Sequence, residues 1–242
     1  MPEQTNRLSI LNRDAIKYIA MFTMLLNHIA NIFLVPATPL YAILTDIGYF
    51  TAPTMCYFLV EGYHYTRSRR KYAKRLAAFA LISQLPFWLA FRQPCLNMMF
   101  TLLLCFGLLC AKDRADTPGR FRFLLIAVIF ASVFCDWAVL APFMTLLFAR
   151  CRDGELSWKN AYLCSMALFL VMQLPDPAAS VPVPFWILSS LGGCAAIAVS
   201  GVTVRLLYNG RRMEHGRNFS KWFFYLFYPA HLLVLVLLRA AM

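Results

Sequence analysis

Charged residues are scarce in this sequence, and the cysteine spacings that mark metal or redox sites are missing. Only 14% of the 242 residues are charged, against about 25% in soluble globular domains, while 61% are hydrophobic. This shortage of charge excludes a soluble domain. The eight cysteines include no C-x-x-C pair, which argues against a zinc ribbon. Cys95 and Cys135 fall at expected helix ends on one side, where a disulfide bridge and two free thiols both remain open.

Acidic residues are scarcer still, because 11 Asp and Glu accompany 23 Lys and Arg. In a soluble protein this basic excess would suggest nucleic acid. Here hydrophobic runs recur along the whole chain between short polar stretches, which is typical of helices that cross a bilayer. We therefore expect an all-α, polytopic transmembrane helical bundle, with residues 1–242 forming one integral membrane domain of the inner or plasma membrane. Membrane lipid is an expected partner and nucleic acid is not.

Nine apolar runs are candidate membrane spans, although four in the middle are shorter than the roughly 17 to 25 residues that a full crossing needs. They cover residues 15–35, 40–63, 76–91, 97–111, 121–135, 137–149, 161–173, 185–204 and 222–238. With a cytoplasmic N-terminus, 21 of the 23 basic residues lie inside and only Arg92 and Arg239 lie outside. Merging the fifth and sixth runs would place 14 inside and 9 outside, a poorer fit to the positive-inside rule. About nine spans with a cytoplasmic N-terminus are therefore predicted.

The first span carries two ionisable residues on one helical face. Lys17 and His28 are eleven residues apart, which is three turns plus roughly 20°, or about 17 Å along the axis. Asp14 and Met21 fall on the same stripe. Lys17 is expected at the cytoplasmic end and His28 in the outer half of the membrane, where a buried ionisable group is costly and marks a functional site. A histidine that is merely hydrogen-bonded between helices is the alternative.

Two other spans bring polar groups toward the same depth. Asp46, in the second span, reaches nearly the depth of His28 and would fix the tautomer of that ring and raise its basicity. In the last span, Pro229 frees a backbone carbonyl one turn earlier, and His231 lies near the middle of the membrane. His28 and Asp46 are therefore candidate catalytic residues, with His231 in reserve.

Glu61 and His64 lie three residues apart on one helical face, as in the Glu-x-x-His pairs of di-metal helical bundles. No second such pair occurs in the sequence, so no metal site is predicted. Glu61 is expected instead to pair with Arg67 or with a basic loop that binds a ligand.

The loop at residues 66–75, TRSRRKYAKR, holds six basic residues in ten. Such a loop anchors the topology and contacts anionic lipid. Its arginines, interleaved with a tyrosine, also suit a phosphate-rich ligand, and both interpretations are retained. The residues expected to bind that ligand are Lys17, Glu61, Arg67, Arg69, Arg70, Lys71 and Arg75.

Several longer stretches resemble one protein family. They are AIKYIAMFTMLLNHIANIF, TAPTMCYFLVEGYHYTRSRRKYAKRLAAFALISQLPF, NMMFTLLL, the pair Asp136 and Trp137, and FFYLFYPAHLLVL. In this order, and over nearly the whole chain, they resemble the TraX family of integral membrane proteins, which is named for the protein that N-acetylates F pilin. The basic residue ten positions before a histidine in the first span also resembles the acyltransferase type 3 enzymes, which use acyl-CoA.

The resemblance implies a membrane acyltransferase that takes an acetyl group from cytoplasmic acetyl-CoA and transfers it to an amine or hydroxyl, such as the N-terminus of a pilin-like protein. It implies that His28 is catalytic and that Lys17 occupies the basic position on the cytoplasmic side. Family members commonly carry Asp before this histidine, where this chain has Asn27, so Asp46 is the residue expected to substitute. The rival interpretation is a non-catalytic assembly factor or transporter of a conjugation or surface-fibre system. The lack of two similar halves argues against a repeat-built transporter.

Overall fold

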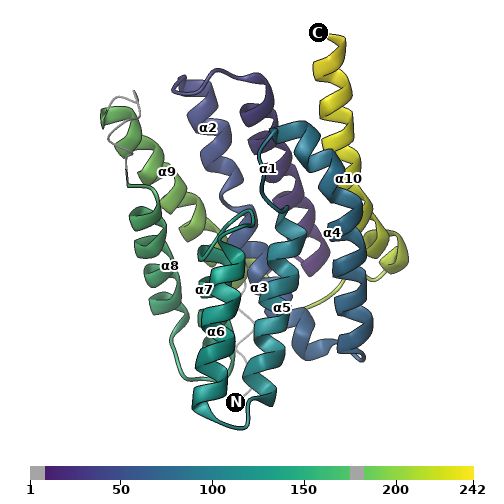
Figure 1. The fold of residues 1–242 in the computed structure, drawn as a ribbon, viewed down its shortest axis with the longest axis vertical. Coiled ribbons are helices and arrows are strands. Elements are labelled where there is room, and N and C mark those ends of the chain that lie inside the picture. Colours follow the sequence, from purple (N-terminus) through teal and green to yellow (C-terminus); the bar gives the residue numbers. More distant parts are fainter. Residues whose placement is uncertain (1–8, 175–182) are drawn as a thin grey trace. The chain divides into compact units, whose positions relative to one another are not determined.

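The computed structural model describes residues 9–174 and 183–242, and both ranges are helical (Figure 1). Two isolated bridges, Leu11 with Tyr208 and Leu96 with Cys135, are the extended pairings in these ranges. The helices are α1 (Arg13–Phe33), α2 (Pro39–Gly48), α3 (Thr51–Tyr65), α4 (Arg69–Phe91), α5 (Met98–Arg114), α6 (Pro118–Ser132), α7 (Leu140–Arg152), α8 (Trp158–Met172), α9 (Val183–Val202), the π-helical turn η1 (Thr203–Leu207) and α10 (Arg217–Ala241).

Each of the nine predicted spans coincides with a helix, and the second corresponds to α2 followed by α3. The prediction of an all-α fold is therefore confirmed. Four segments of the described chain are long and apolar enough to cross a membrane, which supports a membrane protein. They are Arg13–Phe33, Pro39–Tyr65, Val183–Leu207 and Asn218–Ala241. The count of nine spans and the cytoplasmic N-terminus stay predictions, since α6, α7 and α8 have only 15, 13 and 15 residues, fewer than the ~20 that a crossing needs.

Polar side chains set where many of these helices begin. The first backbone N–H groups of a helix have no partner within it, and a side-chain oxygen just before the helix satisfies one of them. Six of the described helices use this device, and their capping residues are Asn12, Thr38, Ser68, Asn97, Thr117 and Ser157. The apolar runs thus give the helices their length, and the caps fix their first residues.

The chain forms two compact units. Unit 1 consists of Met1–Thr54 and Leu170–Phe227, and unit 2 consists of Met55–Phe169 and Tyr228–Met242. α3 and α10 each contribute residues to both units. The expectation of one integral membrane domain over residues 1–242 stays a prediction.

In unit 1, α1 and α2 lie side by side with the chain reversing between them (Figure 1), and α2 also packs on α9. The Thr51 hydroxyl donates to the carbonyl oxygen of Ala20 at 2.7 Å. The Thr54 and Ser200 hydroxyls lie 2.8 Å apart. Because these polar groups are buried, their pairing between helices fixes which faces of α1, α3 and α9 meet.

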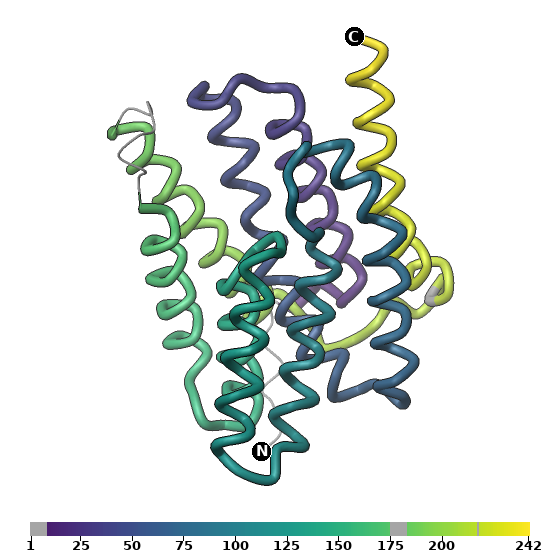
Figure 2. The backbone as a smooth tube through the Cα atoms, viewed as in Figure 1, coloured from purple at the N-terminus to yellow at the C-terminus, as the bar shows by residue number. Residues whose placement is uncertain are grey.

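In unit 2, α5 is the central helix and packs against α4, α6 and α7. Figure 2 shows α5 and α6 running in opposite directions and joined by a short turn. The largest fully buried side chains of this unit are Tyr63, Phe106, Leu108, Met144 and Phe148. This aromatic and aliphatic core holds the polar residues described below in place.

Candidate functional site

The residues predicted for the site are divided between the two units. Lys17, His28 and Asp46 belong to unit 1. Unit 2 contains Glu61, Arg67, Arg69, Arg70, Lys71, Arg75 and His231. Each set therefore has its own local geometry.

The stripe predicted on α1 is buried. Asp14, Met21 and His28 follow one another at seven-residue intervals and are 7%, 3% and 7% exposed. Lys17 is partly buried, and its ammonium group lies 5.1 Å from the centre of the Phe224 ring. A cation over an aromatic face is stabilised by the ring quadrupole. The stripe therefore joins a half-buried cation near the start of α1 to a buried imidazole near its end.

The contacts between α1 and α2 define the level of Asp46 relative to His28 along the helix pair. The side-chain amide of Asn27 donates to the carbonyl oxygen of Thr45 at 3.0 Å. Since His28 and Asp46 directly follow these two residues, they lie at the same level of the helix pair. The Asp46 carboxylate accepts a hydrogen bond from the Ser189 hydroxyl of α9 at 3.0 Å. Its pairing with His28 stays a prediction.

α9 passes close to Asp46, and Gly192 of α9 leaves room for the carboxylate. A Cβ atom placed on Gly192 would lie 2.2 Å from Oδ2 of Asp46, a distance that atoms of a real side chain do not reach. Only glycine is small enough at this position without displacing the carboxylate. The sequence showed Gly192 in an apolar run and gave no sign of this role.

The start of α1 is tied to a distant part of the chain. The Asp14 carboxylate accepts hydrogen bonds from the backbone N–H of Met213 at 2.9 Å and from the Ser220 hydroxyl at 2.7 Å. Asp14 is thus a structural residue that holds the segment before α10 against the Lys17 end of the stripe. The spacing along α1 placed Asp14 on the stripe but could not name these partners.

In unit 2, Arg69 is held in a polar cluster at the start of α4. Its guanidinium lies 2.8 Å from the Asp113 carboxylate and 4.1 Å from the centre of the Tyr63 ring. The Tyr63 hydroxyl donates to the same carboxylate at 2.7 Å. Arg69 therefore ties α3, α4 and α5 together, a role that the sequence did not predict.

The other cations of the loop differ in exposure. Arg67, Arg70 and Lys71 are exposed and make no salt bridge within the described part of the chain. Arg75 is partly buried, with its guanidinium 5.6 Å from the centre of the Tyr72 ring. The three exposed cations, and Lys74, which is also exposed, are therefore the ones most able to meet an incoming phosphate.

Glu61 is 7% exposed on α3, whereas His64 is exposed in the last turn of that helix. Among the described residues, no group of three or more His, Cys, Asp or Glu side chains is placed to hold a metal ion. The expectation that Glu61 and His64 bind no metal stays a prediction.

Unit 2 also contains a buried polar network around Asn97. The Asn97 side-chain amide donates to Oε1 of Gln84 and to the carbonyl oxygen of Ala80, each at 2.8 Å. The Gln84 amide in turn donates to the carbonyl oxygen of Cys95 at 2.9 Å. These bonds fasten the loop between α4 and α5 to the interior of α4. Cys95 and Cys135 are free thiols.

Asp136 lies beside this network in the loop between α6 and α7. Its backbone N–H donates to the carbonyl oxygen of Leu96 at 2.7 Å, and its own carbonyl accepts from the Thr101 hydroxyl at 2.5 Å. Burial raises the pKa of the Asp136 carboxyl to about 6, and a hydrogen bond from the backbone N–H of Trp137 opposes that rise. The carboxylate also interacts electrostatically with Tyr228.

Tyr228 connects this region to His231. The centres of the two rings are 5.7 Å apart, and both side chains are buried. The segments SQLPF, NMMF, Asp136 with Trp137, and YPAH are far apart in the sequence, yet unit 2 brings them together. In the sequence, each of these segments could be noticed by a polar residue in or next to an apolar run. The spacing along the chain could not predict that the segments meet in space.

Comparison with known proteins places the chain in a family. The family model described as "TraX protein" matches residues 12–239. The "Probable fimbrial assembly protein FimC, serogroup H1" of Dichelobacter nodosus is 31% identical over 239 residues, which cover 91% of this chain and 92% of that protein. No solved structure matches the chain. The match to the family model and to this relative along almost the entire length shows that this chain belongs to the TraX family.

Proposed function

We propose that this chain is a membrane acyltransferase that moves an acetyl group from acetyl-CoA to an amine or hydroxyl acceptor. The observation that carries the proposal is His28, a buried imidazole at one end of a buried stripe whose other end is marked by Lys17. An ionisable side chain is costly inside a membrane protein and is retained where it has a function. An imidazole can also accept a proton near neutral pH.

In the proposed reaction, His28 acts as a general base. The acceptor nitrogen or oxygen attacks the carbonyl carbon of the thioester and forms the new C–N or C–O bond. The C–S bond breaks, and the sulfur of CoA leaves with the electron pair. The acceptor proton passes to His28 and then to the thiolate, so that the products are the acetylated acceptor and free CoA. Asp46, at the level of His28, is proposed to orient the imidazole.

The phosphates of CoA are proposed to bind cations. Arg67, Arg70 and Lys71 are the exposed candidates in unit 2, and Lys17 is the candidate in unit 1. Guanidinium groups match phosphate oxygens in geometry as well as charge. These contacts hold the donor before and during the reaction, and we expect them to affect binding more than the chemical step.

The proposed acceptor is the N-terminus of a pilin-like protein. The relative from Dichelobacter nodosus carries the name of a fimbrial assembly protein, and the sequence motifs resemble a family named for pilin acetylation. The same name also favours a second candidate function, in which the chain assists fibre assembly without covalent chemistry. The two candidates differ in whether His28 is needed.

A transfer assay with labelled acetyl-CoA tests the proposal. The purified chain is incubated with the donor and with a synthetic pilin-like peptide that has a free N-terminus. The variants are His28→Ala, His231→Ala and His215→Ala, and the last replaces an exposed histidine and serves as the matched control. We expect His28→Ala to abolish labelling and His215→Ala to leave it unchanged. Fibre assembly that needs the chain but proceeds normally with His28→Ala would favour the assembly factor.

A further inference from the structure

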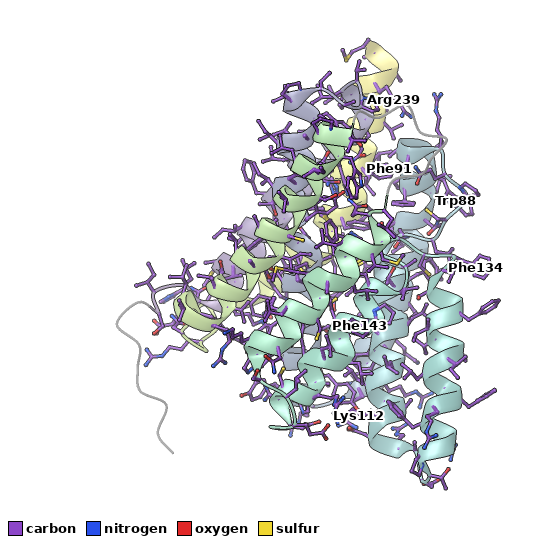
Figure 3. The ribbon with its side chains drawn as sticks, turned by 90° about the vertical axis from the view of Figure 1, so that its left-hand side faces the viewer. Trp88, Phe91, Lys112, Phe134, Phe143 and Arg239 are labelled. Atoms are coloured by element: carbon purple, nitrogen blue, oxygen red, sulfur yellow. The ribbon has the colours of Figure 1, made fainter. Side chains whose placement is uncertain are left out.

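Unit 2 has a cavity of about 310 Å³ at the end where α4 and α10 both terminate. Trp88, Leu89 and Arg92 line it from the end of α4, and Val236, Arg239 and Ala240 line it from the last turns of α10. Figure 3 shows Trp88, Phe91 and Arg239 toward one end of unit 2 and Lys112 toward the opposite end. The volume of the cavity is at the lower limit for small-molecule sites, which suits the headgroup of a lipid rather than a whole lipid.

Arg239 changes the electrostatics of this helix end. Its guanidinium donates to the carbonyl oxygen of Ala90 at 2.7 Å and also to that of Leu89. Carbonyl groups in the last turn of a helix lack helical partners and carry a partial negative charge, which repels anions. Arg239 satisfies two of them and offsets that charge. A guanidinium has five N–H donors, so three remain for another acceptor.

Arg92 adds a second cation to the same cavity. It follows the last residue of α4 with a φ of 54°, and its side chain is exposed. Within the described ranges Arg92 makes no salt bridge, and no acidic residue lines the cavity. The site thus presents two positive charges and no negative one, which fits an anion.

The remaining lining and its surroundings are apolar. Trp88 supplies an indole whose Nε1 donates to the carbonyl oxygen of Cys95 at 2.9 Å, and Leu89 and Val236 complete the wall. The cavity lies at the last turn of Asn218–Ala241, a helix long and apolar enough to cross a membrane. Just before it, four apolar side chains of α10 are exposed, namely Leu233, Val234, Leu237 and Leu238. Tryptophan and arginine at the end of a lipid-facing helix are typical of the headgroup level of a bilayer.

We propose that this cavity binds the phosphate of an anionic glycerophospholipid, with phosphatidylglycerol as the representative ligand. The phosphate oxygens meet the guanidinium groups of Arg92 and Arg239. The glycerol backbone lies against the indole of Trp88, and the acyl chains follow the exposed apolar face of α10. In the topology expected from the basic residues, this lipid belongs to the outer leaflet. The site does not depend on acyl transfer.

Native mass spectrometry of the purified full-length chain in mild detergent tests the proposal. The chain is titrated with phosphatidylglycerol and, separately, with phosphatidylcholine. Arg92→Asn removes the charge with little backbone cost, because asparagine tolerates a positive φ. Arg92→Lys keeps the charge, Arg239→Gln removes the other guanidinium, and Arg122→Gln, an exposed arginine of α6, is the matched control. Thermal unfolding verifies that each variant is folded.

We expect the unmodified chain to retain one phosphatidylglycerol more tightly than phosphatidylcholine. Arg92→Asn should weaken that binding about tenfold, as for the loss of a charge-assisted hydrogen bond, while Arg92→Lys and Arg122→Gln should keep most of it. If Arg239→Gln fails to fold, Arg92→Asn still decides the question. If Arg92→Asn retains phosphatidylglycerol as tightly as the unmodified chain, the proposal is overturned. It is also overturned if Arg122→Gln weakens phosphatidylglycerol binding as much as Arg92→Asn does.

Competition with water-soluble anions separates a lipid site from a general anion site. Inorganic phosphate and glycerophosphoglycerol carry the same charged group without acyl chains. We expect millimolar concentrations of either to leave the bound lipid in place, because the apolar face of α10 contributes to its binding. Displacement of the lipid by inorganic phosphate at those concentrations would identify a soluble-anion site and overturn the lipid assignment.

Discussion

The side-chain amide of Asn27 donates a hydrogen bond to the backbone carbonyl of Thr45, with 3.0 Å between the nitrogen and the oxygen. An ionised aspartate has only acceptors and cannot make this bond. Gly48 adds to the closeness of the two helices, since a Cβ atom there would lie 2.2 Å from Cβ of Asn27. The asparagine that replaces the family's usual aspartate is therefore a packing residue between α1 and α2.

Replacing Asn27 with aspartate should weaken the pair formed by α1 and α2. The variant loses a donor and places two acceptors near each other, which costs about 1 to 3 kcal/mol of unfolding free energy. Thermal unfolding in detergent measures the effect. Asn160→Asp, at an exposed position, is the control and should unfold like the unmodified chain. An unchanged midpoint for Asn27→Asp would show that this bond contributes nothing.

Gly192→Ala should displace the Asp46 carboxylate and break its hydrogen bond with Ser189. The new methyl group would occupy the space of Oδ2 of Asp46. We expect the rate of acetyl transfer to fall toward that of Asp46→Asn. Gly107→Ala is the matched control, because nothing lies within 4 Å of its added Cβ. Its unfolding free energy should rise by about 0.5 to 1 kcal/mol, because alanine has a higher helix propensity than glycine. Full activity of Gly192→Ala would argue against a role for Asp46.

Asn97→Ala and Asn97→Asp should separate two functions of one side chain. Asn97 caps α5 by accepting from the N–H of Met99, and its amide also donates to Gln84 and Ala80. Alanine loses both functions, whereas aspartate keeps the cap but turns a carboxylate oxygen toward the acceptor oxygens of Gln84 and Ala80 in a buried site. We expect a loss of about 2 to 4 kcal/mol of unfolding free energy for alanine, measured by thermal unfolding, and a larger loss for aspartate at neutral pH, because this repulsion outweighs the retained cap. A smaller loss for aspartate than for alanine would mean that the cap contributes more than the two donors.

The basic loop should divide into binding and structural residues. Arg67→Gln, Arg70→Gln and Lys71→Gln should each raise the KM for acetyl-CoA, by up to about tenfold for a lost phosphate contact, with little change in thermal stability. Arg69→Gln should instead lower the unfolding free energy by up to about 1 kcal/mol, because its ion pair with Asp113 is partly exposed. Steady-state kinetics and thermal unfolding of the four variants check this division. Identical kinetic effects for all four would contradict it.

Asp136 should make stability depend on pH. Burial raises the pKa of this carboxyl from 3.8 to about 6. The protonated carboxyl therefore makes its full contribution to the unfolding free energy below about pH 4, and this contribution is lost as the pH rises through 6. Asp136→Asn removes the ionisation. Its unfolding midpoint should exceed that of the unmodified chain at pH 7.5, and the difference should vanish near pH 4. A constant difference across this range would show that Asp136 does not titrate as stated.

The helices were largely predictable from the sequence, because apolar runs and capping residues are local signals. The break between α2 and α3 was not. There the N–H groups of Tyr49 and Phe50 donate to the carbonyls of Asp46 and Ile47, which tightens the turn and ends α2 within an apolar run. Gly48 at the end of α2 and Pro53 in the first turn of α3 were the available signals, but the apolar run appears continuous around them in the sequence.

The candidate site was predictable as a set of residue types and not as a set of contacts. Periodicity along α1 gave the stripe that contains His28. The partners of its neighbours are distant in the chain, since Asp14 contacts Ser220 across 206 residues and Asp46 contacts Ser189 across 143. A local pattern cannot indicate which distant helices meet. The structural role of Arg69 was missed for the same reason, because Asp113 lies on another helix.

The bond between Arg239 and Ala90 also sets an order of events during synthesis. The two residues are 149 positions apart, and at about 5 to 20 residues per second the ribosome needs roughly 7 to 30 s to make the intervening chain. During that interval the last carbonyls of α4 must find water or lipid headgroups instead of Arg239. The end of α4 therefore lacks this partner while α5 to α9, η1 and almost all of α10 are made, and the cavity beside it forms only once α10 is in place.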